Sequence, residues 1–265
     1  MEKKLEVSVI SPVFNERENL KTFVDSVTKV MHSTGMSWEL IVVDDGSDDG
    51  STTVIKELTN QDNIKCLLLA KNYGQTTAIQ AGFDNAIGKY LVTLDSDLQN
   101  DPKDIPALLH KLIEEELDLV VGWRKNRKDN YFLRNLPSSI ANKLIGNITG
   151  VKLHDYGCSL KAYRADVLKE VRLYGEMHRF IPAWMATKIP ASKISELVVT
   201  HHPRIAGKSK YGISRTFRVF VDLISVYFFM RFFSRPGHFF GLIGLLLSSI
   251  GSVSYTHLRA HETEA

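Results

Sequence analysis

Short apolar runs alternate with amphipathic stretches along the first half of the chain. The apolar runs, each of a length that suits one buried strand, are residues 5–11, 38–45, 64–70, 89–95 and 117–123. The stretches between them that place apolar side chains at helical spacing are residues 17–32, 51–59, 75–87 and 103–115. Strands and helices in this alternation form a mostly parallel sheet with helices on both faces. The pattern therefore predicts an α/β fold.

A different pattern follows near the C-terminus. Residues 237–253 run for seventeen positions without a formal charge. A bilayer core of roughly 30 Å needs about 20 apolar residues, so length alone leaves a spanning helix and a buried core helix both open. Arg231 and Arg235 precede the run, and phenylalanines cluster at its start. This flank favours a membrane segment whose N-terminal side is cytoplasmic.

The residues just before this run form a second amphipathic pattern. Phenylalanine and aliphatic side chains share one helical face, and Arg215, Arg218 and Asp222 lie on the other. Core packing produces such a pattern, and so does a helix that lies along an anionic membrane surface. The predicted organisation is a catalytic domain (1–212), an amphipathic juxtamembrane helix (213–235), a membrane segment (236–253) and a polar, truncated or non-native tail (254–265).

Composition and charge narrow the class of protein. The chain has 265 residues, of which 44% are hydrophobic and 24% charged, which excludes a disordered, collagen-like or coiled-coil protein. Cys66 and Cys158 match no zinc site or disulfide framework, and the N-terminus lacks a signal-peptide pattern, so we expect the catalytic domain to face the cytosol. The net charge of +3 conceals a segment, residues 201–235, that carries +6 beside the predicted membrane segment. A basic segment beside an apolar run favours a membrane as partner, and we expect no nucleic-acid partner.

Polar clusters follow the first two predicted strands. Pro12, Asn15 and Glu16 come after the first, and Asp44 and Asp45 after the second. Ligands of such sheets bind outside the carboxyl ends of the strands. Turn formation and helix capping account for either loop equally well. No G-x-G-x-x-G follows the first strand, which argues against a dinucleotide-binding Rossmann domain.

The sharpest cluster follows the fourth predicted strand and contains Asp95, Asp97 and Gln99. Residues i and i+2 of an extended chain point the same way, so Asp95 and Asp97 can present two carboxylates to one point. Hard oxygen ligands suit Mg²⁺ or Mn²⁺, and Mg²⁺ completes its coordination shell with water and substrate phosphates. A solvated turn that opens a helix at Pro102 is the alternative.

Five motifs in order, PVFNE, VVDDGSDDG, LDSDLQNDP, DYGCSLKAYR and HHPRIAGKSKYG, carry a family resemblance over about residues 5–253. The chain resembles the family 2 inverting glycosyltransferases of the polyprenyl-phosphate type, which includes dolichol-phosphate mannose synthase and bactoprenol glucosyltransferase. The resemblance implies a GT-A fold, a UDP- or GDP-linked sugar donor and a divalent metal. It assigns donor binding to Pro12, Asn15, Glu16, Asp44, Asp45, Asp95 and Gln99, and metal binding to Asp95, Asp97 and Gln99. Members often have two spanning helices, whereas this chain offers one.

The chemistry of such a transfer requires charge stabilisation at both ends. A departing nucleoside diphosphate gathers negative charge, which a metal held near Asp97 neutralises. A lipid phosphate acceptor, with a second pKa of about 6 by analogy with phosphoserine, needs cationic positioning more than a general base. Candidate acceptor contacts are Arg124, Arg134, Arg204, Lys208 and Lys210, with Ser209 in the same segment. Each of these cations alone is more typical of a solvated surface charge, and their position at a strand end or ahead of the apolar run is what singles them out.

Asp155 has three interpretations. By resemblance it lies where such transferases keep an acid near the acceptor, so it either orients the nucleophile or acts as a base. A turn aspartate ahead of Gly157 explains it as well. Together with Asp97 and Arg124 it completes the predicted catalytic set, whereas Cys158 is expected to be a small buried hydrophobe.

The sequence thus predicts transfer of a hexose-type sugar to a polyprenyl phosphate, with inversion, at the cytoplasmic face of a membrane. One rival is a family 2 transferase with a polysaccharide or other non-lipid acceptor, which leaves the apolar run without a role. The other is a catalytically silent nucleotide-binding or membrane-scaffold protein, against which the Asp95 and Asp97 pair argues. The identity of the sugar, the base of the donor and formation of a homo-oligomer are left open.

Overall fold

In the computed structural model the chain divides into two compact units, Met1–Thr216 and Phe217–Ala265. The residues that the structure describes are 5–59, 62–125, 145–146, 150–173, 175–203, 221, 224–225, 227–229, 231–232 and 235–263.

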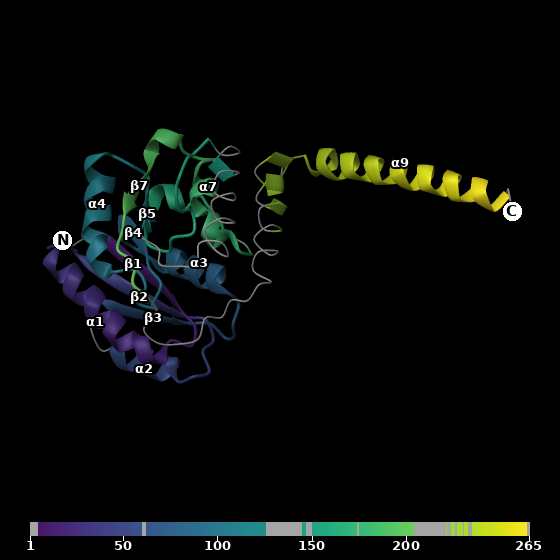
Figure 1. Ribbon diagram of the computed structural model, residues 1–265. Helices are drawn as coiled ribbons and strands as arrows, with labels where there is room; N and C mark the ends of the chain where they lie inside the picture. The colour runs from purple at the N-terminus through teal and green to yellow at the C-terminus, as the bar shows by residue number, and fades with distance from the viewer. Residues whose placement is uncertain are drawn as a thin grey trace. The chain divides into compact units, whose positions relative to one another are not determined.

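The first unit is built on a seven-stranded sheet with the strand order β3-β2-β1-β4-β6-β5-β7 (Figure 1). The strands are β1 (Val7–Val13), β2 (Trp38–Asp44), β3 (Ile64–Leu68), β4 (Tyr90–Thr93), β5 (Leu119–Trp123), β6 (Lys161–Arg164) and β7 (Ile194–Val198). β1 pairs in parallel with β2 and β4, β2 with β3, and β5 with β7, whereas β6 is antiparallel to β4 and β5. The five strands predicted from the apolar runs are confirmed, and β6 and β7 are additional.

The four predicted helices are also confirmed, each with its ends within two residues of the predicted range. They are α1 (Arg17–Ser33), α2 (Ser51–Leu58), α3 (Gln75–Asn85) and α4 (Ile105–Glu114). Shorter helical segments are η1 (Pro102–Asp104), α6 (Ala165–Leu168), η3 (Met177–Phe180), α7 (Ile181–Met185) and η4 (Ala191–Lys193).

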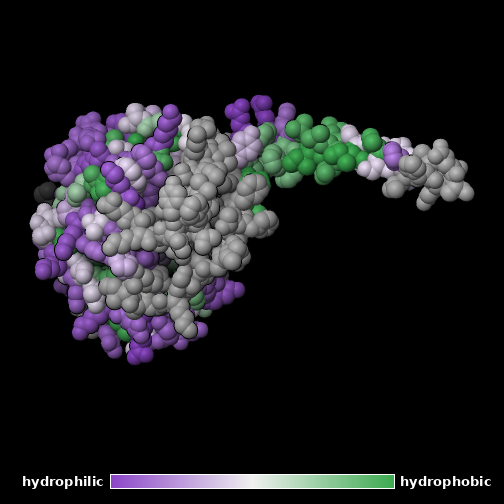
Figure 2. Space-filling view, in the orientation of Figure 1, coloured by the Kyte–Doolittle hydropathy of each residue, from purple (hydrophilic) through white to green (hydrophobic). Residues whose placement is uncertain are grey.

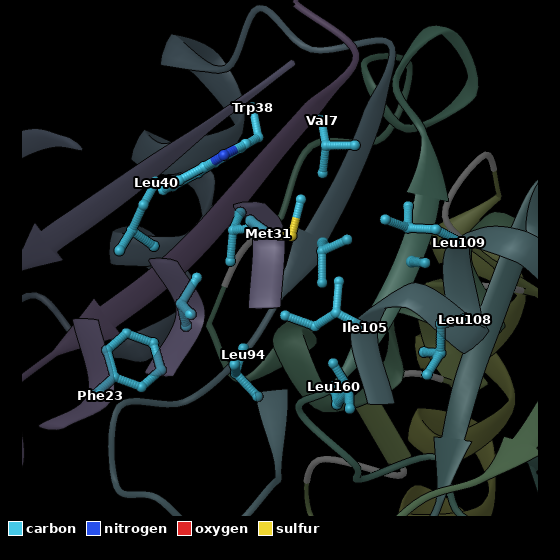
Figure 3. Packing of buried hydrophobic residues seen from close by; sticks show 14 of the residues in the cluster. Val7, Phe23, Met31, Trp38, Leu40, Leu94, Ile105, Leu108, Leu109 and Leu160 are labelled. Carbon is cyan, nitrogen blue, oxygen red and sulfur yellow. The ribbon is translucent and has the colours of Figure 1, made fainter. Parts of the chain in front are cut away.

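Helices cover both faces of the sheet (Figure 1). On one face α1 and α4 bury apolar side chains against the strands, where Phe23, Met31 and Leu108 lie in one cluster with Leu40 (Figure 3). Burial of such a side chain contributes about 1.5–3 kcal/mol. On the other face α3 packs so closely that a Cβ at Gly82 would lie 2.2 Å from Ile10 Cγ2. Packing thus holds α3 directly against the central strand β1.

This topology brings distant parts of the sequence to one edge of the sheet. β1, β2 and β4 are parallel, and two successive antiparallel pairings through β6 make β5 run in the same direction as β4. The carboxyl ends of β1, β2, β4 and β5 therefore share one edge. β6 begins at the same edge, where Lys161 pairs with Thr93 and Val121. The loops that follow Thr93 and precede Lys161 consequently meet there.

The second unit contains α9 (Pro236–Thr263). Over Pro236–His257 its length and its mean hydropathy of 1.5 are sufficient to cross a membrane, and none of the apolar window is buried. Figure 2 shows its hydrophobic surface as a continuous green stretch. The helix extends beyond residue 253 into a stretch for which the sequence pattern predicted no element. Most of the predicted juxtamembrane helix lies outside the described residues.

Candidate active site

The Asp95–Asp97 loop follows β4, at the edge of the sheet where the carboxyl ends of β1, β2, β4 and β5 lie. The backbone N–H of Gln99 donates a 3.1 Å hydrogen bond to Asp97 Oδ1, and Leu98 between them adopts a left-handed φ of 59°. Such a conformation is costly for a residue other than glycine and persists only where the surroundings impose it. Burial and the nearby Asp97 charge together raise the pKa of Asp95 to about 6. The structure therefore brings the two carboxylates to one place.

Two neighbouring segments hold this loop in position. Gln75, the first residue of α3, donates a 2.8 Å hydrogen bond from Nε2 to Asp95 Oδ1. The Asn100 carboxamide donates to Ser159 Oγ at 2.8 Å, and Thr93 Oγ1 donates to the Ser159 carbonyl at 2.7 Å. Ser159 also hydrogen-bonds Asp95, which lowers the pKa of that carboxyl in part. The start of α3 and the segment before β6 thus both support the acidic loop.

Arg124 and Asp155 form a bidentate ion pair beside the acidic loop. Arg124 Nε lies 2.6 Å from Asp155 Oδ2, and Nη2 lies 2.9 Å from Oδ1. Both side chains are about nine-tenths buried, with 11% and 10% of their surface exposed. Burial disfavours the charged guanidinium, yet the surrounding anionic groups raise the pKa of Arg124 above its usual range. The charges of Arg124 and Asp95 influence each other, so the ion pair and the carboxylate pair belong to one cluster.

Lys161 is a second cation at this site that the sequence analysis did not single out. The residue is 2% exposed and donates a hydrogen bond from Nζ to the Cys158 carbonyl. Burial lowers the pKa of Lys161 to about 8, against the opposing influence of neighbouring Asp155 and Asp95. Cys158 itself is fully buried, as expected. In the described part of the chain the site therefore gathers three carboxylates and two cations.

The predicted donor contacts lie at the carboxyl ends of β1 and β2 and in the loops that follow these strands. Asp44 accepts hydrogen bonds from Ser47 N at 3.0 Å and Thr52 Oγ1 at 2.5 Å. Asp45 accepts from the backbone N–H groups of Tyr73 at 2.7 Å and Gly74 at 2.9 Å. These buried carboxylates shape the loop before α2 and the turn that starts α3.

The loop after β1 is tied to the loop after β2 by a reciprocal pair of hydrogen bonds. Asn15 Nδ2 donates to Asp48 Oδ1 at 2.8 Å, and Asp48 N donates to Asn15 Oδ1 at 3.0 Å. Glu16 accepts from Asn19 Nδ2 at 2.7 Å, and the Pro12 carbonyl accepts from Ser96 Oγ at 3.4 Å. The structure thus gathers these predicted donor contacts at the same sheet edge as Asp95.

The predicted acceptor contacts are less completely described. Arg124 is part of the cluster, whereas Arg134, Arg204, Lys208, Ser209 and Lys210 lie outside the described residues. The last described residues before that segment are anchored to the acidic loop, since His202 N donates a 2.7 Å hydrogen bond to the Gln99 carbonyl.

The donor atoms near Asp95 suit a divalent cation that arrives with its substrate. Among the described residues, no group of three His, Cys, Asp or Glu side chains is placed to hold a metal ion. The loop supplies the Asp95 and Asp97 carboxylates, and Mg²⁺ characteristically takes one or two carboxylates and completes its shell with phosphate oxygens and water. A divalent cation would also relieve the repulsion that raises the pKa of Asp95. The residues therefore fit Mg²⁺ or Mn²⁺.

Comparison with known proteins gives a consistent set of matches. A family model described as glycosyl transferase family 2 matches residues 8–172. Dodecaprenyl-phosphate galacturonate synthase from Rhizobium johnstonii is 55% identical over 256 residues, which cover 96% of this chain and 76% of the relative. Undecaprenyl-phosphate 4-deoxy-4-formamido-L-arabinose transferase from Yersinia pestis is 38% identical over 246 residues, with coverage of 91% and 74%.

Solved structures show the same fold at low sequence identity. Glucosyl-3-phosphoglycerate synthase from Mycobacterium tuberculosis, in complex with Mn²⁺, UDP and glucosyl-3-phosphoglycerate, has a TM-score of 0.66 and 16% identity, covering 85% of this chain and 80% of that one. TarS from S. aureus, in complex with UDP-GlcNAc, has a TM-score of 0.61 and 19% identity, with coverage of 88% and 69%. These likenesses confirm the predicted GT-A fold.

Proposed function

This chain belongs to the family 2 glycosyltransferases, and from that premise we propose that it transfers a sugar from a nucleotide-sugar donor to a polyprenyl phosphate at a membrane surface. The observation that carries the proposal is the convergence of the Asp95 and Asp97 carboxylates with the Arg124 and Asp155 ion pair at one sheet edge. The Asp95 and Asp97 carboxylates suit a diphosphate with its metal, and the Arg124 guanidinium beside them suits a phosphate. Both curated relatives reported above are named for polyprenyl phosphates.

The acceptor end of the reaction requires cations. A lipid phosphate with a second pKa of about 6 is largely dianionic at neutral pH, so its oxygen attacks the sugar carbon without a general base. Both Asp155 oxygens are engaged by Arg124, which favours an orienting role for Asp155 over that of a base. The guanidinium has five N–H donors, and those not directed at Asp155 can meet a phosphate.

The donor end requires neutralisation of the departing diphosphate. Asp95, Asp97 and Gln99 would hold Mg²⁺ or Mn²⁺, which when bound acts as a Lewis acid on the diphosphate. The nucleoside would bind at the carboxyl ends of β1 and β2 and the loops that follow them, where Pro12, Asn15, Glu16, Asp44 and Asp45 lie. Because attack and departure occur in one displacement, the anomeric configuration of the sugar inverts.

We propose UDP-galacturonate as the first donor to test. The relative with 55% identity is named for galacturonate, and the solved neighbours contain UDP. α9 would cross the membrane with the catalytic unit on the cytoplasmic side, where Arg134 and the basic segment with Arg204, Lys208, Ser209 and Lys210 would meet the lipid phosphate.

The test is a donor screen with radiolabelled nucleotide sugars. Purified protein in detergent micelles is incubated with Mn²⁺, undecaprenyl phosphate and labelled UDP-galacturonate, UDP-glucose or GDP-mannose, and the mixture is extracted into organic solvent. We expect label in the organic phase, dependent on the lipid phosphate. Label in aqueous polymer would indicate a non-lipid acceptor, and no transfer from any donor would contradict an enzymatic role.

Two aspartate variants control the donor screen. Asp97→Ala should abolish transfer, because it removes a proposed metal contact. Asp84→Ala should leave transfer unchanged, because Asp84 is an exposed partner of Arg172 on the surface of the domain.

A further inference from the structure

Two consecutive residues at the end of β5 pair with two consecutive residues of the segment that leads to β6. The Trp123 and His154 rings are stacked, with centroids 4.1 Å apart and an interplanar angle of 14°. The next residues along each chain segment, Arg124 and Asp155, form the bidentate ion pair. The position of Asp155 is therefore coupled to the position of its neighbour His154.

A residue from a third element completes this arrangement. Glu196 lies on the edge strand β7, which pairs in parallel with β5 so that Glu196 is opposite Val121. Its Oε2 accepts a 2.8 Å hydrogen bond from the His154 backbone N–H, and its Oε1 pairs with His154 Nδ1. The His154 side chain is 63% exposed, whereas that of Glu196 is 19% exposed. Trp123 thus holds the largely exposed imidazole by its ring face, and Glu196 contacts both the imidazole Nδ1 and the backbone N–H of the same residue.

These contacts add to those that hold the later part of the same segment, where Asn100 and Thr93 hydrogen-bond Ser159. From Gly150 to Leu160 the chain forms neither helix nor strand, so side chains take the place of a sheet ladder. Tyr156 donates to the Val151 carbonyl within the segment, and Cys158 contacts Asn100 of the acidic loop at 3.6 Å. Directly before Asp155 in the sequence, Trp123 and Glu196 both contact His154.

We propose that Glu196 is a positioning residue for sugar transfer, acting through His154 to hold Asp155 and, with it, the Arg124 guanidinium in register with the acceptor phosphate. This inference rests on the proposed function. Glu196 contacts His154 and would therefore act through it, as a positioning residue and not as a substrate contact. A displacement of about 1 Å at a reacting group can lower a rate by roughly 100-fold, which gives the scale of the expected effect.

The kinetic test compares Glu196→Ala with Glu196→Gln and His154→Ala. Glu196→Ala should lower kcat about 10- to 100-fold, while the KM for the nucleotide sugar stays within about twofold, because the donor loops are unaffected. Glu196→Gln should recover most of the loss, since a carboxamide can still accept from the His154 backbone and donate to Nδ1. His154→Ala should behave like Glu196→Ala, and the double variant should be no worse than either single one. Glu115→Ala, which breaks an exposed pair with Lys111, is the matched control.

Hydrogen exchange followed by mass spectrometry supplies a readout that does not depend on activity. Because the His154 amide donates to Glu196, Glu196→Ala should speed exchange in the peptide that spans residues 153–160 and leave peptides of β1 unchanged. If wild-type protein transfers no sugar but Glu196→Ala still speeds exchange in residues 153–160, the proposed function is overturned. The coupling of Glu196 to this segment would stand. Unchanged kcat in Glu196→Ala or in His154→Ala, or unchanged exchange, would overturn the positioning role. If Glu196→Ala fails to fold, the exposed His154→Ala carries the same test.

Discussion

Gln75 Nε2 donates a 2.8 Å hydrogen bond to Asp95 Oδ1 and thereby links the first turn of α3 to the acidic loop after β4. This hydrogen bond is made to one of the two oxygens of the Asp95 carboxylate. Ser159 also hydrogen-bonds Asp95, so two side chains hold this carboxylate beside Asp97. The orientation of Asp95 therefore depends on a helix that the sequence analysis placed correctly but did not connect to the site.

Removal of this contact should weaken metal binding. Partners of metal ligands typically contribute 10- to 100-fold in affinity or activity, so Gln75→Ala should raise the Kd for Mn²⁺ in the presence of UDP by about tenfold or more. Isothermal titration calorimetry measures the change. Gln80→Ala, which removes a similar contact to Asp84 on the same helix, should leave the Kd unchanged. Equal affinities in wild type and Gln75→Ala would show that Gln75 does not orient a metal ligand.

The pH dependence of metal binding should report on Asp95. Burial and the Asp97 charge raise the pKa of Asp95 to about 6, and only the deprotonated carboxylate binds a metal. Affinity for Mn²⁺ should therefore be constant above about pH 7 and fall as the pH decreases through 6, approaching tenfold per unit. Asp95→Asn, tested in parallel, should show weak binding without this decline. A wild-type affinity that stays constant from pH 7.5 to 5 would disagree with the assignment of Asp95 as a ligand.

Kinetics with each substrate varied in turn tests the basic segment. Arg204→Ala and Lys208→Ala should raise the apparent KM for polyprenyl phosphate far more than that for the nucleotide sugar. Charge-assisted hydrogen bonds contribute roughly 1.5 to 3 kcal/mol, which corresponds to about 10- to 150-fold in affinity. Arg204→Lys should recover only part of the loss, because lysine lacks the planar fork. An equal loss for donor and acceptor would assign these residues to the donor site or to the fold.

Membrane insertion of α9 can be tested at its midpoint. Leu246 lies near the centre of the apolar window and is 56% exposed. Arginine at the centre of a spanning helix costs about 2.5–3.5 kcal/mol, so Leu246→Arg should reduce the membrane-bound fraction after carbonate extraction. Ser254→Arg, nearer the end of the window, is the control and should have a smaller effect. Full retention of Leu246→Arg in the membrane would argue against a spanning helix.

Local periodicity explains why most of the first unit was predictable. The strands that end at Val13 and Asp44 and the helix α1 between them can each be predicted from the spacing of apolar residues that are close in sequence. β6 was missed because four residues that include Lys161 and Arg164 form no apolar run. Its antiparallel insertion between β4 and β5 depends on pairing between distant segments, which no local pattern contains.

The residues of the site also divide into those that a local sequence pattern predicts and those that distant segments bring together. Asp95 and Asp97 were predictable because their spacing alone places them together. The ion pair of Arg124 with Asp155 joins positions 31 apart and depends on the turn into β6. Gln75 and Lys161 carried no signal in the sequence, since a glutamine at a helix start and a single lysine are both typical of exposed positions. Only the packed structure shows that Lys161 is buried beside the carboxylates.

The structure of the reaction product tests the central claim most directly. Wild-type protein is incubated with its preferred nucleotide sugar and undecaprenyl phosphate, and the purified lipid product is examined by proton, carbon and phosphorus NMR. The account predicts a phosphodiester between the lipid phosphate and the anomeric carbon, with the anomeric configuration opposite to that of the donor. A product in which the sugar is attached elsewhere than to the lipid phosphate, or in which the donor configuration is retained, would contradict it.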